Sequence, residues 1–219
     1  MEKELESIMK ENHISEILPA DVLKQLKLFS YSKGEIIVYA GEKSINLSII
    51  VSGRCLVKPI GVEGQETILT YLYPGDLIGD IELFTKRDYL HYVYADTDVK
   101  LLKIPANLVN KQLASYVPFL HFVIDNTFEK LLNHSTYFSD ARLYGSKARL
   151  VKYILDVSCR LNAKEIPFII EDVAPFIGVS ERHLRRIIKD LENEKLIEKK
   201  YRKLQILKMN ELKERENKS

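Results

Sequence analysis

The residues between 169 and 197 combine several charged side chains with a spacing that would present them on one face of a helix. If residues 181 to 193 form a helix, its outer face carries five charged side chains: Glu181, Arg182, Arg185, Arg186 and Lys189. An arginine guanidinium can donate two hydrogen bonds to O6 and N7 of a guanine in the major groove. The chemistry expected here is therefore contact with bases and phosphates, although an ordinary solvated helix face would carry the same residues.

The residues around this face predict a helix-turn-helix that would position it. Ala174 is small enough to let two helices approach closely, and Gly178 permits the sharp turn between them. Ser180 is a good N-cap for the second helix, and its hydroxyl or the backbone N–H groups behind it could instead take a phosphate. The inner face of that helix would bury Leu184, Ile187, Ile188 and Leu191. Pro175 is tolerated if the first helix starts near Asp172, so that the proline lies in its first turn.

A basic segment follows, EKKYRKLQIL, and it predicts a β-hairpin wing. Its cations, which could reach backbone phosphates, are Lys199, Lys200, Arg202 and Lys203.

Charge is also uneven along the whole chain. Residues 1–141 hold 14 Lys and Arg against 19 Asp and Glu, whereas residues 142–219 hold 19 against 12. A basic C-terminal third favours a polyanion partner, although a solvated basic face explains the charge alone equally well.

The preceding part of the chain predicts a β-domain. Residues 29–104 contain short β-rich runs separated by Gly- and Pro-containing turns: EIIVY, LSIIVSG, CLVKPI, TILTYLY, YVYA and VKLLKI. Short strands at this spacing indicate an antiparallel sandwich or roll. Residues 14–28 read as one short amphipathic helical segment with Pro19 in its first turn. The expected fold class is α+β, with an N-terminal antiparallel β-roll of jelly-roll type.

A helical pattern takes over after Pro105, first over about 105–115 and then from 117 to about 144. Apolar residues of the longer helix recur in steps of four and three, which is the spacing of a coiled-coil seam. We therefore predict a parallel homodimer with the interface His121, Ile124, Phe128, Leu131, Ser135 and Phe138. The alternative is a long helix that packs only on its own β-roll. Ser146 is a plausible N-cap for the next helix, about 147–160, and the best hinge candidate is 142–146.

The predicted domains are a β-roll sensor at 1–116, a dimerisation helix at 117–144 and a winged helix-turn-helix at 145–219. No run of about 18 apolar residues occurs, and the charged N-terminus lacks the apolar core of a secretory signal. We expect a cytoplasmic protein without a membrane partner. Cys55 and Cys159 lie far apart, so neither a disulfide framework nor a tetrahedral metal site is expected from them.

Three stretches in this order resemble the Crp/Fnr family of bacterial transcription regulators over about residues 15–207. They are KGEIIVYAGE with LSIIVSGRCLV, then TILTYLYPGDLIGDIELF, then EDVAPFIGVSERHLRRIIKDLENEKLI. The resemblance implies a cytoplasmic dimer, a palindromic double-stranded DNA site, and transcription controlled by an effector at the roll. By family habit it also implies an activator, with RNA polymerase as a partner.

The resemblance carries over to single residues of the helix-turn-helix. Arg186 matches the family's most important base-reading arginine, and Ser180 matches the residue before the recognition helix. The cyclic-AMP receptor type has Arg then Glu, whereas this chain has Glu181 then Arg182, which puts the recognised half-site in doubt. His183 and Arg185 occupy positions that could add base or phosphate contacts.

The effector cassette departs further from the family pattern. The family's Gly-Glu pair is Gly79-Asp80 here, Glu82 replaces a small residue, and the phosphate-binding arginine falls on Tyr89, with Arg87 two residues away. A cyclic phosphate would meet two carboxylates without a matched cation, so we expect that cyclic AMP does not bind. The tentative effector pocket comprises Leu77, Ile78, Gly79, Asp80, Ile81, Glu82, Leu83, Tyr89, His91, His134 and Ser135.

Other functions fit the sequence less well. A metal-dependent barrel enzyme needs clustered histidines, but residues 29–104 contain only His91, and no nucleophile elbow or phosphate loop appears. An iron–sulfur sensor needs four cysteine ligands and the chain has two. Haem ligation by His91, His121 or His134 stays open, but we expect no cofactor or metal and leave the effector unidentified. A constitutive DNA-binding regulator, whose roll has lost its ligand, is the main alternative.

Overall fold

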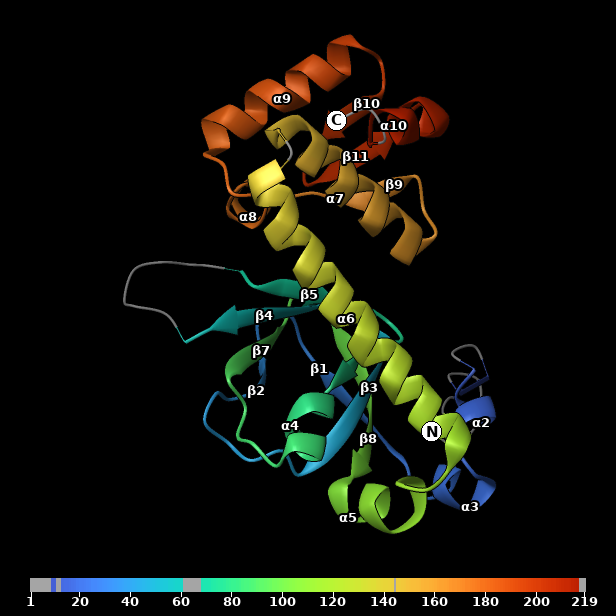
Figure 1. Cartoon of the computed structure of the whole chain (residues 1–219). Helices are drawn as coiled ribbons and strands as arrows, with labels where there is room; N and C mark the ends of the chain where they lie inside the picture. Colours follow the sequence, from blue (N-terminus) through green and yellow to red (C-terminus); the bar gives the residue numbers. More distant parts are fainter. Residues whose placement is uncertain (1–8, 11–12, 61–67, 144, 217–219) are drawn as a thin grey trace. The chain divides into compact units, whose positions relative to one another are not determined.

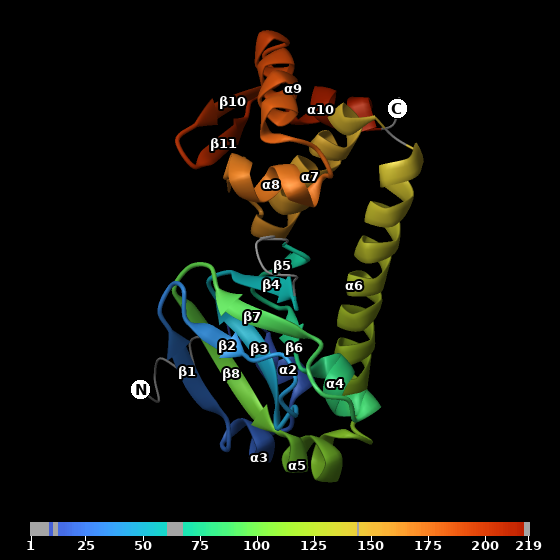
Figure 2. The same cartoon turned by 90° about the vertical axis from the view of Figure 1, so that its left-hand side faces the viewer.

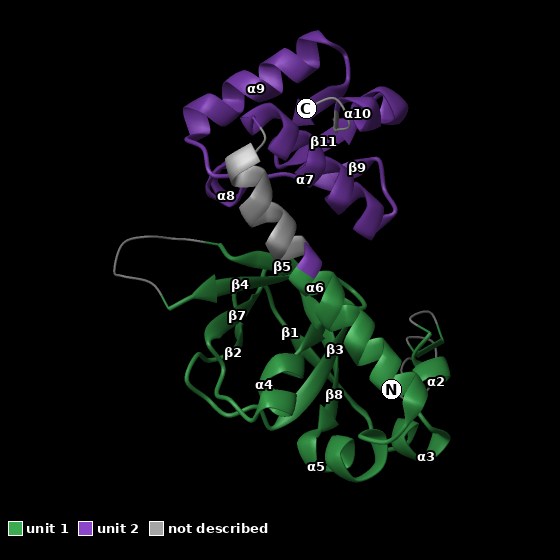
Figure 3. Ribbon diagram, viewed as in Figure 1, with its two compact units in different colours: residues 1–131 green, residues 132–219 purple. Residues whose placement is uncertain are grey.

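The computed structural model describes residues 9–10, 13–60, 68–143 and 145–216. The chain forms two compact units, residues 1–131 and 132–219 (Figure 1, Figure 3). The division falls inside the long helix α6 (Val117–Leu143), whereas the sequence places domain ends at 116 and 144. The expected α+β class is confirmed, with antiparallel sheets in the first unit and a helix-turn-helix in the second.

Among the described residues, the first unit contains two four-stranded antiparallel sheets. One has the order β1 (Lys27–Tyr31), β8 (Val99–Pro105), β3 (Asn46–Ser52), β6 (Leu77–Ile78). The other has the order β2 (Ile36–Val38), β7 (His91–Ala95), β4 (Cys55–Pro59), β5 (Thr70–Leu72). Figure 2 shows β4 and β5 toward one end of this roll and the short helices α3 and α5 toward the other.

Strand β3 explains why the roll has two cores. Side chains alternate between the faces of a strand, and here both faces are buried. Leu47, Ile49 and Val51 pack into a cluster that includes Phe119 of α6. Ile50 points the other way, into the cluster between the two sheets. A strand covered on both sides reads as the continuous apolar run seen in the sequence.

The helix predicted over 14–28 is wrong in its continuity. The structure has two single turns, α2 (Ile14–Ile17) and α3 (Ala20–Leu23), and β1 already begins at Lys27. Leu18 is extended at φ −126° and ψ 140°, and Pro19 caps α3. A proline ring disfavours helical geometry in the residue before it, which breaks the helix. The predicted apolar stripe is Leu18, Val22, Leu23 and Leu26. Leu18, Val22 and Leu26 are buried, and Leu23 is half-buried.

The helical region after the roll begins with α5 (Ala106–Leu108) and a π-helical turn, η1 (Val109–Leu113). The next helix, α6, then lays Phe119 and Val123 into the roll's core. The side chains of His134, Ser135 and Phe138 lie outside the described part of the chain.

The second unit is built on α7 (Ser146–Leu161), α8 (Ile170–Phe176), α9 (Glu181–Asn193) and α10 (Met209–Glu216). A small antiparallel sheet with the order β10 (Ile197–Lys200), β11 (Lys203–Ile206), β9 (Glu165–Pro167) completes it among the described residues. Tyr153 of α7 packs edge-on against Phe168 and Phe176, at ring-centre distances of 6.1 and 5.4 Å. These aromatic contacts tie α7 to the helix-turn-helix.

Two predicted helix starts in this unit need correction. Helix α8 begins at Ile170 rather than near Asp172, so Pro175 lies in the last turn and not the first. There the proline supplies no backbone donor to the carbonyl four residues before it, and the helix ends one residue later at Phe176. The N-cap of α7 is Gly145, and Ser146 is the first helical residue. The Ser146 hydroxyl lies 2.7 Å from Nε2 of His183 instead.

Candidate DNA-binding interface and effector pocket

The turn of the helix-turn-helix has the geometry that its sequence predicts. Ala174 is 1% exposed, and Gly178 adopts a left-handed φ of 71°. A residue with a side chain would be strained there, so the sharp turn depends on glycine. Ser180 caps α9, and its hydroxyl accepts a hydrogen bond from the backbone N–H of His183 at 3.3 Å. The predicted bounds of this helix, 181 to 193, are confirmed.

Helix α9 separates an apolar inner face from a charged outer face. The predicted inner residues are all at most 4% exposed: Leu184, Ile187, Ile188 and Leu191. The predicted outer residues are all exposed: Glu181, Arg182, Arg185, Arg186 and Lys189. This separation fixes which face of α9 packs against the rest of the unit and which face points to solvent. The arginines therefore project away from the core of the unit, where a ligand can reach them.

Two of these arginines have partners on the protein surface. Arg185 Nη2 lies 3.1 Å from Glu181 and 3.5 Å from Glu171. Exposed ion pairs of this kind contribute about 0–1 kcal/mol, so they yield readily to a phosphate or a base. Arg186 Nη2 lies 3.0 Å from Nδ1 of His183. His183 itself is only half-exposed, and its other ring nitrogen lies 2.7 Å from the Ser146 hydroxyl.

The predicted wing forms the hairpin of β10 and β11, with register Lys200 to Lys203 at its tip. Arg202 is exposed and adopts a left-handed φ of 56°. Lys200 and Lys203 are exposed and both pair with Glu165 of β9, Lys203 at 2.6 Å. Lys199 is half-buried, and burial lowers the pKa of its ammonium group. Arg202, Lys200 and Lys203 are therefore better placed than Lys199 to contact phosphates.

The predicted effector cassette lies where β6 meets the short helix α4 (Asp80–Thr85). Gly79 has a φ of 88°, and a Cβ there would lie 2.7 Å from the Tyr89 hydroxyl and 2.8 Å from the Ser44 hydroxyl. Tyr89 and Ser44 are 3.0 Å apart through those hydroxyls. Burial raises the pKa of the Tyr89 phenol. The tyrosine thus packs against Gly79 as a neutral side chain, while Arg87 is exposed.

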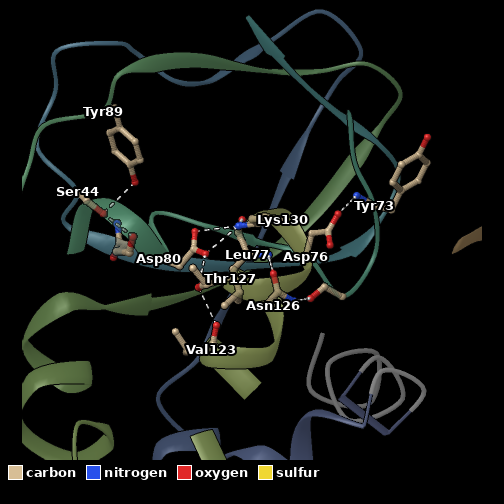
Figure 4. A network of polar contacts seen from close by, with 12 residues as sticks. Ser44, Tyr73, Asp76, Leu77, Asp80, Tyr89, Val123, Asn126, Thr127 and Lys130 are labelled. Carbon is tan, nitrogen blue, oxygen red and sulfur yellow. Dashed lines mark hydrogen bonds and ion pairs between the residues drawn. The ribbon is translucent and has the colours of Figure 1, made fainter. Parts of the chain in front are cut away.

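Asp80 is 3% exposed and is paired with Lys130 of α6 (Figure 4). The Lys130 ammonium donates to both carboxylate oxygens at 2.9 Å, and the Thr127 hydroxyl donates to one of them at 3.2 Å. The sequence predicts that a bound phosphate would meet Asp80 and Glu82 without a matched cation. A cation, Lys130, does lie beside the cassette, but it is paired with Asp80. The cation comes from a helix 50 positions further along the chain.

The same face of α6 also holds the backbone of β6 and of the turn before it. Asn126 accepts from the Leu77 N–H at 3.1 Å and donates to the Gly75 carbonyl at 2.9 Å, and Lys130 donates to the Leu77 carbonyl at 2.6 Å. The sequence reasoning missed both α6 residues. Their signal was available, because they continue the buried face of Phe119 and Val123 at seven-residue steps. Polar residues on such a face need partners.

The other predicted pocket residues do not converge on one surface. Leu77 and Ile78 are at most 4% exposed and belong to the two cores, whereas Ile81 is 47% exposed. Leu83 packs half-buried against the core, and His91 is half-buried at the start of β7. Glu82 is half-buried, and burial, reinforced by the negative Asp80, raises the pKa of its carboxyl group. The polar part of the site therefore centres on Asp80, Glu82 and Tyr89.

The predicted dimer seam is exposed wherever its side chains are described. Ile124, Phe128 and Leu131 of α6 are 47%, 58% and 59% exposed, and His121 is exposed beside them. Large apolar side chains left in a row on one helix face indicate an interaction surface.

Among the described residues, no helix is long and apolar enough to cross a membrane.

Comparison with known proteins supplies the family context. The cyclic nucleotide-binding domain family matches residues 28–116, and the Crp-like helix-turn-helix domain family matches residues 148–215. The cAMP-activated global transcriptional regulator CRP of Haemophilus influenzae is 24% identical over 184 residues, covering 80% of this chain and 81% of that protein.

Solved structures share the fold. FixK2 of Bradyrhizobium japonicum aligns with a TM-score of 0.75 at 17% identity, covering 86% of this chain and 96% of that one. The c-di-GMP responsive global regulator CLP of Xanthomonas campestris aligns with a TM-score of 0.68 at 18% identity, covering 86% and 99%.

Proposed function

Because this chain belongs to the Crp/Fnr family of DNA-binding transcription regulators, we propose that it is a homodimer that reads a palindromic double-stranded DNA site with α9. The observation that supports this most is α9 itself, a capped helix with a buried inner face and exposed arginines outside. Such a helix fits the major groove. In a dimer, two copies would contact half-sites about 34 Å apart, one turn of B-DNA.

Within this proposal the side chains divide the work. Arg186 is the main base reader, and Arg182 and Arg185 add base or phosphate contacts from the same exposed face. Lys189 and the wing residues Lys200 and Arg202 contact backbone phosphates, which fix the register of the protein on the duplex.

The dimer rests on α6. Regulators of this family act as dimers, and the exposed row of Ile124, Phe128 and Leu131 offers a seam in steps of four and three. Ser135 and Phe138 continue the same spacing. The role of transcriptional activator, with RNA polymerase as the protein partner, is proposed from family membership alone.

We propose further that the roll answers to a signal other than cyclic AMP. A cyclic phosphate would meet the Tyr89 phenol where the family has a cation. It would also lie close to the carboxyl group of Glu82, whose pKa is raised by burial. Lys130, a cation beside the cassette, is already paired with Asp80. Displacing it would leave a buried carboxylate without a partner, which is costly.

A constitutive regulator is the second candidate, and the Asp80–Lys130 pair favours it. The cassette and α6 are joined by the chain's own side chains. In that case the roll supports the DNA-binding state without any ligand.

Selection of bound fragments from a random double-stranded DNA pool tests the function. Wild type and Arg186→Ala are compared at about 0.1–0.15 M salt, because phosphate contacts make affinity depend steeply on salt. We expect a palindrome for wild type and a loss of its information content in the variant. A failure to enrich any sequence, with or without cell extract, would overturn the proposal.

Thermal shift measurements separate the two candidates for the roll. A ligand that binds only the native state raises the melting temperature. We expect no rise with cyclic AMP and a rise with some fraction of a metabolite collection. If no metabolite raises it while the apo protein selects a palindrome, the constitutive candidate replaces the effector-controlled one.

A further inference from the structure

His183 links the recognition face to the first residue of α7. Its Nδ1 lies 3.0 Å from Nη2 of Arg186, and its Nε2 lies 2.7 Å from Oγ of Ser146. All three residues belong to the second unit. Each of the two ring nitrogens is therefore within hydrogen-bond distance of one partner.

The chemistry of the partners determines the state of the ring. A guanidinium has only donors, so Nδ1 of His183 must accept from Arg186 and cannot carry a proton. A neutral imidazole then carries its proton on Nε2, which donates to the Ser146 hydroxyl. The structure is thus consistent with one neutral tautomer of His183, whereas a protonated ring would present a donor to the arginine.

Ser146 is itself held firmly against the helix-turn-helix. The next residue, Lys147, lies 2.6 Å from Glu194, the C-cap of α9. Arg149 donates from Nε to the carbonyl of Ile177, the C-cap of α8, at 3.0 Å. The first turn of α7 therefore contacts the C-terminal end of α9 and the turn between α8 and α9. It is a fixed point to which His183 can be tethered.

We propose that His183 is a positioning residue for Arg186. Tethered to Ser146, its Nδ1 holds one N–H of the guanidinium, and the remaining donors stay available for guanine O6 and N7. Ordering the arginine before DNA arrives lowers the conformational entropy lost on binding. This inference rests on the proposed function, and it replaces the direct base or phosphate contact first expected of His183.

Two substitutions test the two ring nitrogens of His183 separately. Asn places its amide oxygen near the position of Nδ1, whereas Gln places its terminal amide near that of Nε2. His183→Asn keeps an acceptor for Arg186 and loses the tether, and His183→Gln keeps the contact with Ser146 and loses that acceptor. Affinity for the selected palindrome and for a scrambled duplex is measured at one salt concentration on the full-length protein.

For His183→Gln we expect the ratio of specific to non-specific affinity to fall about three- to tenfold, the range of one net hydrogen bond. His183→Asn should lose less of the ratio than His183→Gln, and Ser146→Ala about twofold. Affinity for scrambled DNA should stay unchanged in all three. Equal ratios for His183→Gln and wild type would overturn the inference, while a wild type that selects no sequence would overturn the proposed function instead.

The ring state provides a test that needs no DNA-binding measurement. Nitrogen-15 spectra of histidine-labelled wild type should show His183 as the Nε2–H tautomer, assigned by its absence in His183→Asn. The Nδ1–H tautomer, or a charged ring under the binding conditions, would overturn the inference whatever the affinities of the variants for DNA. A purely packing role for His183 would not select a tautomer.

Discussion

The recognition helix and the effector cassette treat their charges in opposite ways. On α9, Arg182, Arg185 and Arg186 stay exposed, and the partners of Arg185 are surface carboxylates. In the cassette, Asp80 is 3% exposed and its two oxygens share one ammonium group. Exposed charges interact weakly with their neighbours and remain available to a ligand. A buried pair is available only at the cost of breaking it.

The two cysteines give the sharpest contrast between the units. Cys55 is fully buried in the roll, and burial raises the pKa of its thiol to about 12, whereas Cys159 is exposed. Only the thiolate reacts with iodoacetamide, so Cys55 should be labelled about a thousandfold more slowly than an ordinary thiol. Mass spectrometry of tryptic peptides follows both sites. Rapid native labelling of Cys55 would contradict the burial of that strand.

Breaking the ion pair tests the buried side of the comparison. Lys130→Met leaves the Asp80 carboxylate without its cation and should lower the free energy of unfolding by about 3–5 kcal/mol. Urea unfolding followed by circular dichroism measures it. Arg185→Ala, which breaks exposed pairs, should cost about 1 kcal/mol or less.

The matched control for Lys130→Met is the double variant Asp80→Asn with Lys130→Met, which removes both charges and should recover much of the loss. If Lys130→Met costs no more than Arg185→Ala, the pair is not the stabilising link that its burial indicates.

Substitutions on α9 test the exposed side. Arg186→Ala should weaken binding to the selected site by about 1–3 kcal/mol and leave unfolding within about 0.5 kcal/mol of wild type. Lys189→Ala is the control, because losing a phosphate contact weakens selected and scrambled DNA equally and lowers the salt slope by about one. Fluorescence anisotropy over a salt series measures both. Equal losses on both DNAs for Arg186→Ala would make it a phosphate contact only.

The smallest effect is expected at Glu82. Burial, with the negative Asp80 nearby, raises the pKa of the Glu82 carboxyl group in the folded protein above its usual value of 4.5. The folded state therefore favours the protonated form, and stability from this group is lost as the pH rises through the folded pKa. Glu82→Gln should raise the melting temperature slightly near pH 7. The gain should vanish in acid, where both side chains are neutral, and a gain that grows in acid would reverse this assignment.

The second unit was largely readable from the sequence because its signals are local. Gly178, Ser180 and Leu184 lie within one turn or two of each other, and each acts through its own backbone geometry, cap or periodicity. The cap of α9 joins residues three apart. Errors appeared where two local signals competed, as at Pro19, where an apolar stripe favoured a continuous helix and the proline broke it.

The cassette could not be read in the same way. The sequence identified Asp80 and Tyr89 as departures from the family pattern, and the fold decided what they contact. Lys130 is 50 positions from Asp80, and Tyr89 is 45 positions from Ser44. No periodicity or cap connects residues at such separations. Only the packing of α6 on β6 and α4 brings the ammonium to the carboxylate.

By itself, then, the sequence determined the order of roll, long helix and helix-turn-helix and the charged face of α9, while the resemblance of three stretches indicated the family. The order and the charged face follow from composition, spacing and turn residues, which act within a few positions. The tertiary structure alone decided that Lys130 neutralises Asp80 and that Ser146, predicted as a cap, serves His183 instead. Those pairs depend on which helix faces pack together, because a buried polar group is satisfied by whatever partner the fold brings to it.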